Sequence, residues 1–312
     1  MRRFNNTWLF LLMAGMSFSS LAEAREPDAV IDLWEQNAPG ETTRETGVKL
    51  ERRANENPPA TRIKEITRPQ LHLFQPPAEK RNGTAVLIFP GGAYNYVVAD
   101  KEGSETAEWL NSLGITAFVA HYRTKELKPR AQTDAKLPPF SERPLQDGQR
   151  AVSLVRKRAT EWGIKPDQIG VIGFSAGGQA AALITTRFNE RAYEAKDDVD
   201  QVSCRPDFSL LIYPWRLVDE KTGELNEVLT INKTTPPTLM IHAHNDHATP
   251  ISSILFYTAL KKNGVPSELH IYENGGHGYG MRPVDDSYVD TWPDRAGDWL
   301  RQHSLANPGT KD

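Results

Sequence analysis

The hydrophobic pattern changes character near residue 85 of the chain. From there on, short continuous apolar runs alternate with longer segments in which apolar residues recur at helical spacing. Each run has the length of a strand buried on both faces, which predicts strands over 85–89, 116–121, 169–174, 208–213, 238–242 and 268–272. The predicted helices are 104–113, 145–162, 251–263 and 288–303, the last broken at Pro293. This alternation predicts an α/β fold with a mainly parallel central sheet and helices on both faces.

The segment before this alternation is polar and rich in proline and charge. We interpret residues 25–60 as an N-terminal arm and residues 61–305 as one α/β domain, with an edge strand over 70–74. Residues 124–143 interrupt the alternation with three prolines. Because this long loop follows a strand, we expect a lid or a substrate-facing insertion there.

The N-terminus has the pattern of an export signal. Arg2 and Arg3 precede an apolar run over 8–14, and Ala22-Glu23-Ala24 fits the small-x-small cleavage pattern. We therefore expect residues 1–24 to be removed and the protein to be secreted or periplasmic. The alternative is an uncleaved membrane anchor, for which the apolar run is short.

Charge and cysteine content narrow the classes of partner. The formal net charge of −3 argues against nucleic-acid binding, which usually needs a basic face. Cys204 is the single cysteine, so no disulfide can form within the chain. We expect no cofactor, no nucleic acid and no membrane contact after signal cleavage, while the oligomeric state stays open.

A nucleophile motif follows the predicted strand 169–174. Residues 173–177, Gly-Phe-Ser-Ala-Gly, match the pattern G-x-S-x-G, which holds a serine in a strained strand-to-helix turn. Such a turn lifts the hydroxyl above the sheet and directs a helix N-terminus toward it, where developing negative charge is stabilised. Ser175 is therefore the predicted nucleophile, and an ordinary Gly-Ser turn is the alternative.

A second glycine-rich turn follows the predicted strand 85–89. Residues 89–94, Phe-Pro-Gly-Gly-Ala-Tyr, resemble the H-G-G-G loop of esterases, with proline and alanine at two of its positions. Such a loop presents bare backbone N–H groups to a substrate carbonyl. The expected oxyanion donors are Gly92 or Ala93, together with Ala176. The alternative is a simple strand-to-helix turn.

The predicted base is His277. It lies in a glycine-rich loop, residues 275–280, after the last predicted strand, where flexible neighbours let an imidazole reach the serine. His242, His244 and His247 cluster elsewhere and raise the alternative of a metal site. We expect no metal, because His242 falls in a predicted strand and no helix motif of histidine and carboxylate accompanies it.

The predicted acid is Asp246, between serine and histidine in sequence. It follows the strand 238–242, and Thr249-Pro250 then opens a helix, so its carboxylate can hold the second imidazole nitrogen. Asp207 and Asp219 are the competing carboxylates, around the preceding strand. The three predicted residues support acyl transfer through an acyl-enzyme.

These motifs together resemble the α/β-hydrolases of the carboxylesterase and acetylxylan-esterase-like group, often labelled "xylanase-like" bacterial proteins. The resemblance covers about residues 60–305, and Asp32-Leu33-Trp34 also matches this group. It implies a serine esterase that removes acetyl or aromatic acyl groups from plant polysaccharides or sugar esters. Export fits that role, because such polymers are met outside the cytoplasm.

Three other functions share parts of this pattern. A prolyl-oligopeptidase-like peptidase usually carries a large β-propeller, for which the chain has no room. A lipase favours a more apolar lid than 124–143, and a non-enzymatic binding protein on this fold would normally have lost a member of the triad. Tyr94, Trp215 and Tyr279 lie next to the motifs, where they line a sugar or acyl pocket or serve as packing aromatics.

Overall fold

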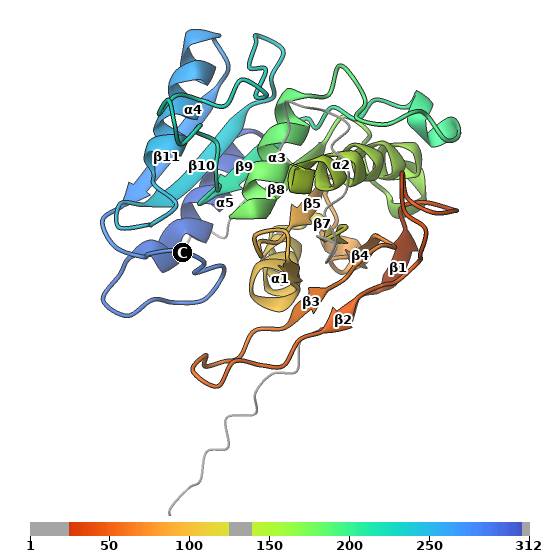
Figure 1. Ribbon diagram of the computed structural model, residues 1–312, viewed down its shortest axis with the longest axis horizontal. Helices are drawn as coiled ribbons and strands as arrows, with labels where there is room; N and C mark the ends of the chain where they lie inside the picture. Colours follow the sequence, from red (N-terminus) through yellow and green to blue (C-terminus); the bar gives the residue numbers. More distant parts are fainter. Residues whose placement is uncertain (1–24, 125–138, 308–312) are drawn as a thin grey trace, which may run out of the picture.

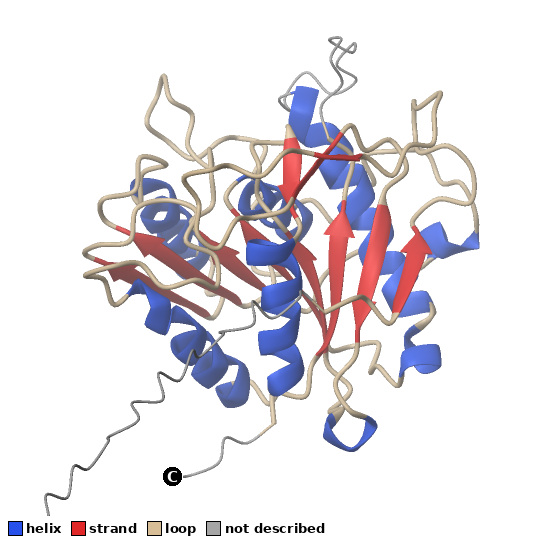
Figure 2. Ribbon diagram, turned by 90° about the horizontal axis from the view of Figure 1, so that it is seen from below, coloured by secondary structure: helices blue, strands red, loops and turns tan. Residues whose placement is uncertain are grey.

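A single large sheet organises the part of the chain that the computed structural model describes, residues 25–124 and 139–307. Its order is β1 (Ala29–Asp32), β4 (Gln70–Phe74), β7 (Thr116–His121), β5 (Ala85–Phe89), β8 (Ile169–Phe174), β9 (Phe208–Ile212), β10 (Thr238–Ala243) and β11 (Ser267–Tyr272). The strands from β7 to β11 are parallel, whereas β4 runs antiparallel to both of its neighbours. The predicted mainly parallel sheet is therefore confirmed (Figure 2).

The strands in the middle of the sheet are apolar throughout because they are buried on both faces. Every residue of β5 and β8 is buried, and the two strands pair in parallel with Leu87 opposite Val171. A strand covered on both faces loses hydration at every position, so only a continuous apolar run is stable there.

Helices form a layer on each face of the sheet (Figure 1). One face carries α2 (Pro139–Lys157), α3 (Ala176–Thr186) and α4 (Ile251–Lys262), and the other carries α1 (Glu105–Ser112) and α5 (Trp292–Gln302). Short helical segments are η1 (Ala78–Lys80), the π-helical η2 (Asp100–Ser104), η3 (Ala159–Trp162), η4 (Asp198–Gln201) and η5 (Val289–Thr291). No helix in the described residues is long and apolar enough to cross a bilayer.

Two predicted helix features are wrong in detail. Pro293 does not break the last helix but lies in the first turn of α5, where a missing N–H costs no hydrogen bond. The helix α2 begins at Pro139, so the end of the expected insertion is helical. Residues 125–138, the rest of that insertion, lie outside the described residues, as does the predicted export signal.

The N-terminal segment contributes to two sheets. Strand β4 forms at 70–74 as predicted, but it is not an edge, because β1 pairs with its outer side. A second antiparallel sheet joins β2 (Val48–Lys49), β3 (Arg62–Lys64) and β6 (Tyr96–Val98). These strands are short and partly exposed, so they carry little of the apolar periodicity that predicts strands.

Candidate active site

Ser175 occupies the sharp turn between β8 and α3. Its backbone φ is +53°, a region that L-residues rarely adopt, so the surrounding structure must hold it there. A Cβ at Gly173 would lie 2.1 Å from the carbonyl oxygen of Gly177, and one at Gly177 would lie 2.0 Å from that of Phe89. The motif therefore needs its two glycines because backbone segments touch at both positions.

Ser175, His277 and Asp246 form one hydrogen-bonded chain. Ser175 Oγ lies 2.7 Å from His277 Nε2, and His277 Nδ1 lies 2.8 Å from Asp246 Oδ2 and 2.9 Å from Oδ1. The acid and base loops are also tied together, because Asn245 Oδ1 accepts the N–H of Gly276 at 2.8 Å. The structure thus brings the predicted nucleophile, base and acid together in the predicted order.

The Asp246 carboxylate is fully buried and surrounded by donors. Burial alone raises its pKa, but the nearby His242 ring and the hydrogen bonds from His277 and from the N–H of Ala248 outweigh that effect and hold the pKa well below its usual range. His242 Nε2 lies 3.2 Å from Asp246 Oδ2, and its Nδ1 lies 2.9 Å from Ser253 Oγ. The contact of His242 with the acid was not expected from the sequence, because histidine spacing does not reveal which way a strand residue points.

The predicted oxyanion donors lie beside the serine. Gly92 and Ala93 line the same cavity as Ser175, with φ values of +136° and +51°. In the described part of the chain, the N–H groups of Gly92, Ala93 and Ala176 donate to no protein acceptor. The N–H of Gly91, in contrast, donates to Glu102 Oε2 at 2.6 Å. Three backbone donors are therefore free to meet a substrate oxygen.

A cavity of about 460 Å³ opens above Ser175 and His277. One wall of the cavity comes from the N-terminal segment, β6 and η2, and it is polar and charged: Arg53, Glu56, Arg62, Tyr96 and Lys101. Within this wall, the hydrogen bond from Arg62 is the largest influence on Glu56 and lowers the pKa of its carboxyl group to about 2. The wall therefore presents fixed ionic and hydrogen-bonding groups to whatever enters the cavity.

The three candidate aromatic residues have different surroundings. Trp215 lines the cavity. Tyr94 is fully buried and donates its hydroxyl to Gln179 Oε1 at 3.0 Å, while Tyr279 is 4% exposed and packs 4.4 Å from the Tyr213 ring. Tyr94 and Tyr279 are therefore packing residues, so the second of the two alternatives that the sequence left open describes both of them, and neither lines this cavity.

The two aspartates that competed with Asp246 for the role of the acid lie away from His277. Asp207 accepts the N–H of Ile169 at the opposite end of the sheet, and Asp219 lies in an exposed turn where it accepts backbone N–H groups. Neither contacts His277 in the described structure.

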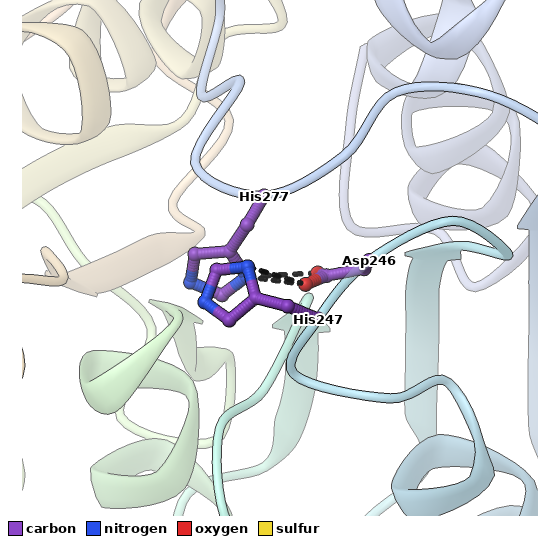
Figure 3. Close-up of side chains that lie close together, drawn as sticks. All are labelled: Asp246, His247 and His277. Atoms are coloured by element: carbon purple, nitrogen blue, oxygen red, sulfur yellow. Dashed lines mark hydrogen bonds and ion pairs between the residues drawn. The ribbon is translucent and has the colours of Figure 1, made fainter.

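The histidines suggested as metal ligands do not converge. His242 is buried beside the acid, and His244 is exposed. The described residues instead bring ligand atoms of Asp246, His247 and His277 within 4.8 Å of one another (Figure 3). A cation held by these three residues would take the place of the proton between His277 and Asp246, so it would oppose the acid–base chemistry of this pair.

Two further residues at the site were missed by the sequence analysis. Glu102 lines the cavity although it is only 3% exposed, and Tyr213 donates its hydroxyl to Glu102 Oε1 at 2.9 Å. Burial raises the pKa of Glu102, although the N–H of Gly91, the Tyr213 hydroxyl and the charges of Lys101 and His277 act in the opposite direction. The one signal in the sequence was an acidic residue shortly before a predicted helix, where a negative charge is favoured by the helix dipole.

Comparison with known proteins agrees with this architecture. The BD-FAE family model matches residues 71–212, and the model of the prolyl oligopeptidase family matches residues 211–304. An acetyl ester-xyloside bifunctional hydrolase from Caldicellulosiruptor lactoaceticus is 30% identical with a TM-score of 0.70, over 90% of this chain and 98% of that one. A thermophilic esterase from Thermogutta terrifontis shares the fold at 21% identity, with a TM-score of 0.65 over 78% of this chain and 92% of that one.

A curated relative points to the same group. The acetylxylan esterase of Xylanibacter ruminicola is 30% identical over 258 residues, which are 74% of this chain and 48% of that protein. The chain thus spans about half the length of this relative. With its elbow, its sheet order and these similarities, the chain belongs to the α/β-hydrolase superfamily, in the acetylxylan-esterase-like group of carboxylesterases.

Proposed function

We propose that this protein is a serine carboxylester hydrolase in which Ser175 is the nucleophile, His277 the base and Asp246 the acid. The observation that carries the proposal is the continuous hydrogen-bonded chain from Ser175 Oγ through both nitrogens of His277 to Asp246, at the floor of an open cavity. Nucleophile, base and orienting acid in this geometry are the requirements of acyl transfer.

Acylation begins when Ser175 Oγ attacks the ester carbonyl carbon and His277 Nε2 takes its proton. The carbonyl oxygen becomes negative and receives hydrogen bonds from the N–H groups of Ala176 and of Gly92 or Ala93. Asp246 stabilises the imidazolium that forms. His277 then gives the proton to the leaving alkoxide, the alcohol departs, and the acyl group remains on Ser175.

Deacylation repeats these steps with water. His277 removes a proton from water, the resulting hydroxide attacks the acyl carbon, and the same backbone donors hold the oxyanion. When the bond to Ser175 Oγ breaks, His277 returns the proton and the free enzyme is restored.

We propose that the substrates are acetyl or aromatic acyl esters of plant polysaccharides or of sugars derived from them. Support comes from the polar wall of the cavity, which suits the many hydroxyl groups of a sugar, and from Trp215, whose ring can pack on a pyranose face. The relatives named as acetylxylan esterase and acetyl ester-xyloside hydrolase point in the same direction.

We also propose that the protein is exported, because residues 1–24 carry a signal-like pattern. N-terminal sequencing of the protein recovered outside the cytoplasm tests this: a start after residue 24 supports export, and an intact N-terminus in the cytoplasmic fraction contradicts it.

The activity is tested by hydrolysis of p-nitrophenyl acetate by wild type and Ser175→Ala, with acetylated xylan and a prolyl peptide anilide in parallel. We expect the wild type to cleave the ester and the variant to lose at least about 10⁴-fold in kcat. Acetate release from xylan supports the substrate class, whereas anilide cleavage without ester cleavage favours a peptidase. Equal inactivity of wild type and variant on every ester contradicts the proposal.

A further inference from the structure

A buried carboxyl group that the mechanism above does not use lies directly behind the oxyanion loop, residues 89–94. Glu102 belongs to η2, the π-helical turn that leads into α1. Removing a carboxyl group from water is costly unless hydrogen-bond donors replace the water, so the partners of Glu102 indicate what holds it there.

The two oxygens of Glu102 bind two different loops. Oε2 accepts the N–H of Gly91 at 2.6 Å, within the oxyanion loop, and Oε1 accepts the Tyr213 hydroxyl at 2.9 Å. The Tyr213 oxygen in turn accepts the N–H of Gly280 at 2.9 Å, at the end of the histidine loop, residues 275–280. One carboxyl group therefore links the loop that carries the oxyanion donors to the loop that carries the base.

This link lies next to the reacting atoms. Gly91 is held between Glu102 and the nucleophile, since a Cβ on Gly91 would lie 2.8 Å from Glu102 Oε2 and 2.9 Å from Ser175 Cβ. The residues that follow Gly91 are the proposed donors Gly92 and Ala93, so a displacement of Gly91 moves their N–H groups relative to Ser175.

Tyr213 extends the link to the imidazole. Its ring packs edge-on against His277, with centroids 5.1 Å apart and an interplanar angle of 61°. Two residues further on, the N–H of Trp215 donates to the carbonyl oxygen of Ser175 at 2.9 Å. The segment that directly follows β9 thus contacts the base through the Tyr213 side chain and the elbow through the Trp215 backbone.

We propose that Glu102 is a positioning residue for acyl transfer. By accepting hydrogen bonds from the Gly91 N–H and the Tyr213 hydroxyl, it holds the oxyanion donors at a fixed position relative to Ser175 and His277. This inference rests on the proposed function. Oxyanion donors act chiefly on the transition state, so their displacement lowers kcat while substrate binding is retained.

The test compares Glu102→Ala and Glu102→Gln with wild type on p-nitrophenyl acetate, measuring kcat and KM separately together with the thermal midpoint. We expect Glu102→Ala to lower kcat by about 10- to 100-fold with KM nearly unchanged. Glu102→Gln should recover most of this loss, because its amide oxygen can still accept the Gly91 N–H. Glu108→Gln, on the exposed side of α1, is the matched control and should behave as wild type.

Tyr213→Phe keeps the inference testable even where Glu102→Ala does not fold, since it removes a single hydroxyl. We expect a smaller fall in kcat, about 3- to 10-fold, again at nearly constant KM. The double variant Glu102→Gln/Tyr213→Phe should lose less than the two single losses combined, because both act through one network.

Three outcomes would overturn the positioning role: wild-type kcat in Glu102→Ala and Tyr213→Phe, a loss confined to KM, or a Gln variant as impaired as the Ala variant. In each case the ester hydrolysis by wild type leaves the proposed function standing. Equal inactivity of wild type and Ser175→Ala instead removes the proposed function, and the positioning role with it.

Discussion

Asp246 is held by more groups than are needed to orient one imidazole. Besides the two contacts with His277, its Oδ1 accepts the N–H of Ala248 at 2.7 Å, and its Oδ2 lies close to His242. A carboxylate fixed at both oxygens accepts a proton on His277 Nδ1, which leaves Nε2 without a proton and, in the proposed mechanism, able to take one from Ser175. Because the pKa of Asp246 lies below its ordinary value, this carboxylate stays ionised wherever an imidazole titrates.

Replacing that charge tests the role of the acid. Asp246→Asn keeps the shape but offers an amide to His277 Nδ1, and we expect kcat/KM for p-nitrophenyl acetate to fall by about 10³- to 10⁴-fold. Asp219→Asn, at the exposed competing aspartate, should retain wild-type kinetics. The opposite pattern, a normal Asp246→Asn and an inactive Asp219→Asn, would exclude Asp246 as the acid.

Among the secondary-structure elements, the neighbouring strands β4 and β7 each contribute one histidine to a stacked pair. His72 of β4 and His121 of β7 stack with ring centroids 3.9 Å apart. Burial lowers the pKa of His72 to about 4; for His121, burial together with the neighbouring His72 lowers the pKa to about 3. The folded protein therefore keeps both rings neutral at pH values where the unfolded chain, with an ordinary histidine pKa near 6.5, binds protons.

This pair makes the pairing of β4 with β7 sensitive to acid. Its stabilising contribution is complete above about pH 6.5 and declines as the pH falls toward about 4 and 3, because protons then favour the unfolded chain. In His121→Leu, the loss of free energy of unfolding between about pH 7 and about pH 4.5, measured with urea, should be smaller than in wild type. The exposed His244→Gln serves as control, and an equal pH dependence in wild type and His121→Leu would refute this assignment.

At the scale of the whole molecule, the N-terminal segment is part of the buried interior. Trp34 donates its indole N–H to Asp147 Oδ1 at 3.1 Å. Glu41 forms ion pairs with Arg143 and, at 3.3 Å, with Arg123, whose side chain is completely buried. Charges in such a place persist only in the company of opposite charges, so the segment and the large sheet stabilise each other.

Removing one carboxylate from this cluster tests that dependence. Glu41→Ala leaves two buried guanidinium groups with one carboxylate fewer, and we expect the free energy of unfolding to fall by about 3 kcal/mol. Glu35→Ala, at a nearby exposed glutamate, should change it by less than about 0.5 kcal/mol. Chemical denaturation of both variants gives the comparison, and equal stability of the two would show that the cluster is not a source of stability.

The residues of the site that could be predicted are those that lie in short sequence motifs. Residues 173–177 carry their own geometric reason, since glycines are required wherever backbone segments touch. Glu102, Tyr213 and His242 carry no such signal, because each contacts a residue of another segment of the fold: Gly91, Gly280 and Ser253.

The run of buried strands, their alternation with helices and the three loops that carry Ser175, Asp246 and His277 could all be predicted from local patterns. Apolar periodicity and glycine spacing are local properties, so they can be read before the chain is folded. Which side chains face inward follows only from the fold: it buries Tyr94 and Tyr279, places Trp215 in the lining of the cavity, and adds β1 outside β4. Side-chain direction and strand order depend on contacts between segments far apart in sequence, and the free energy that selects them exists only when those segments meet.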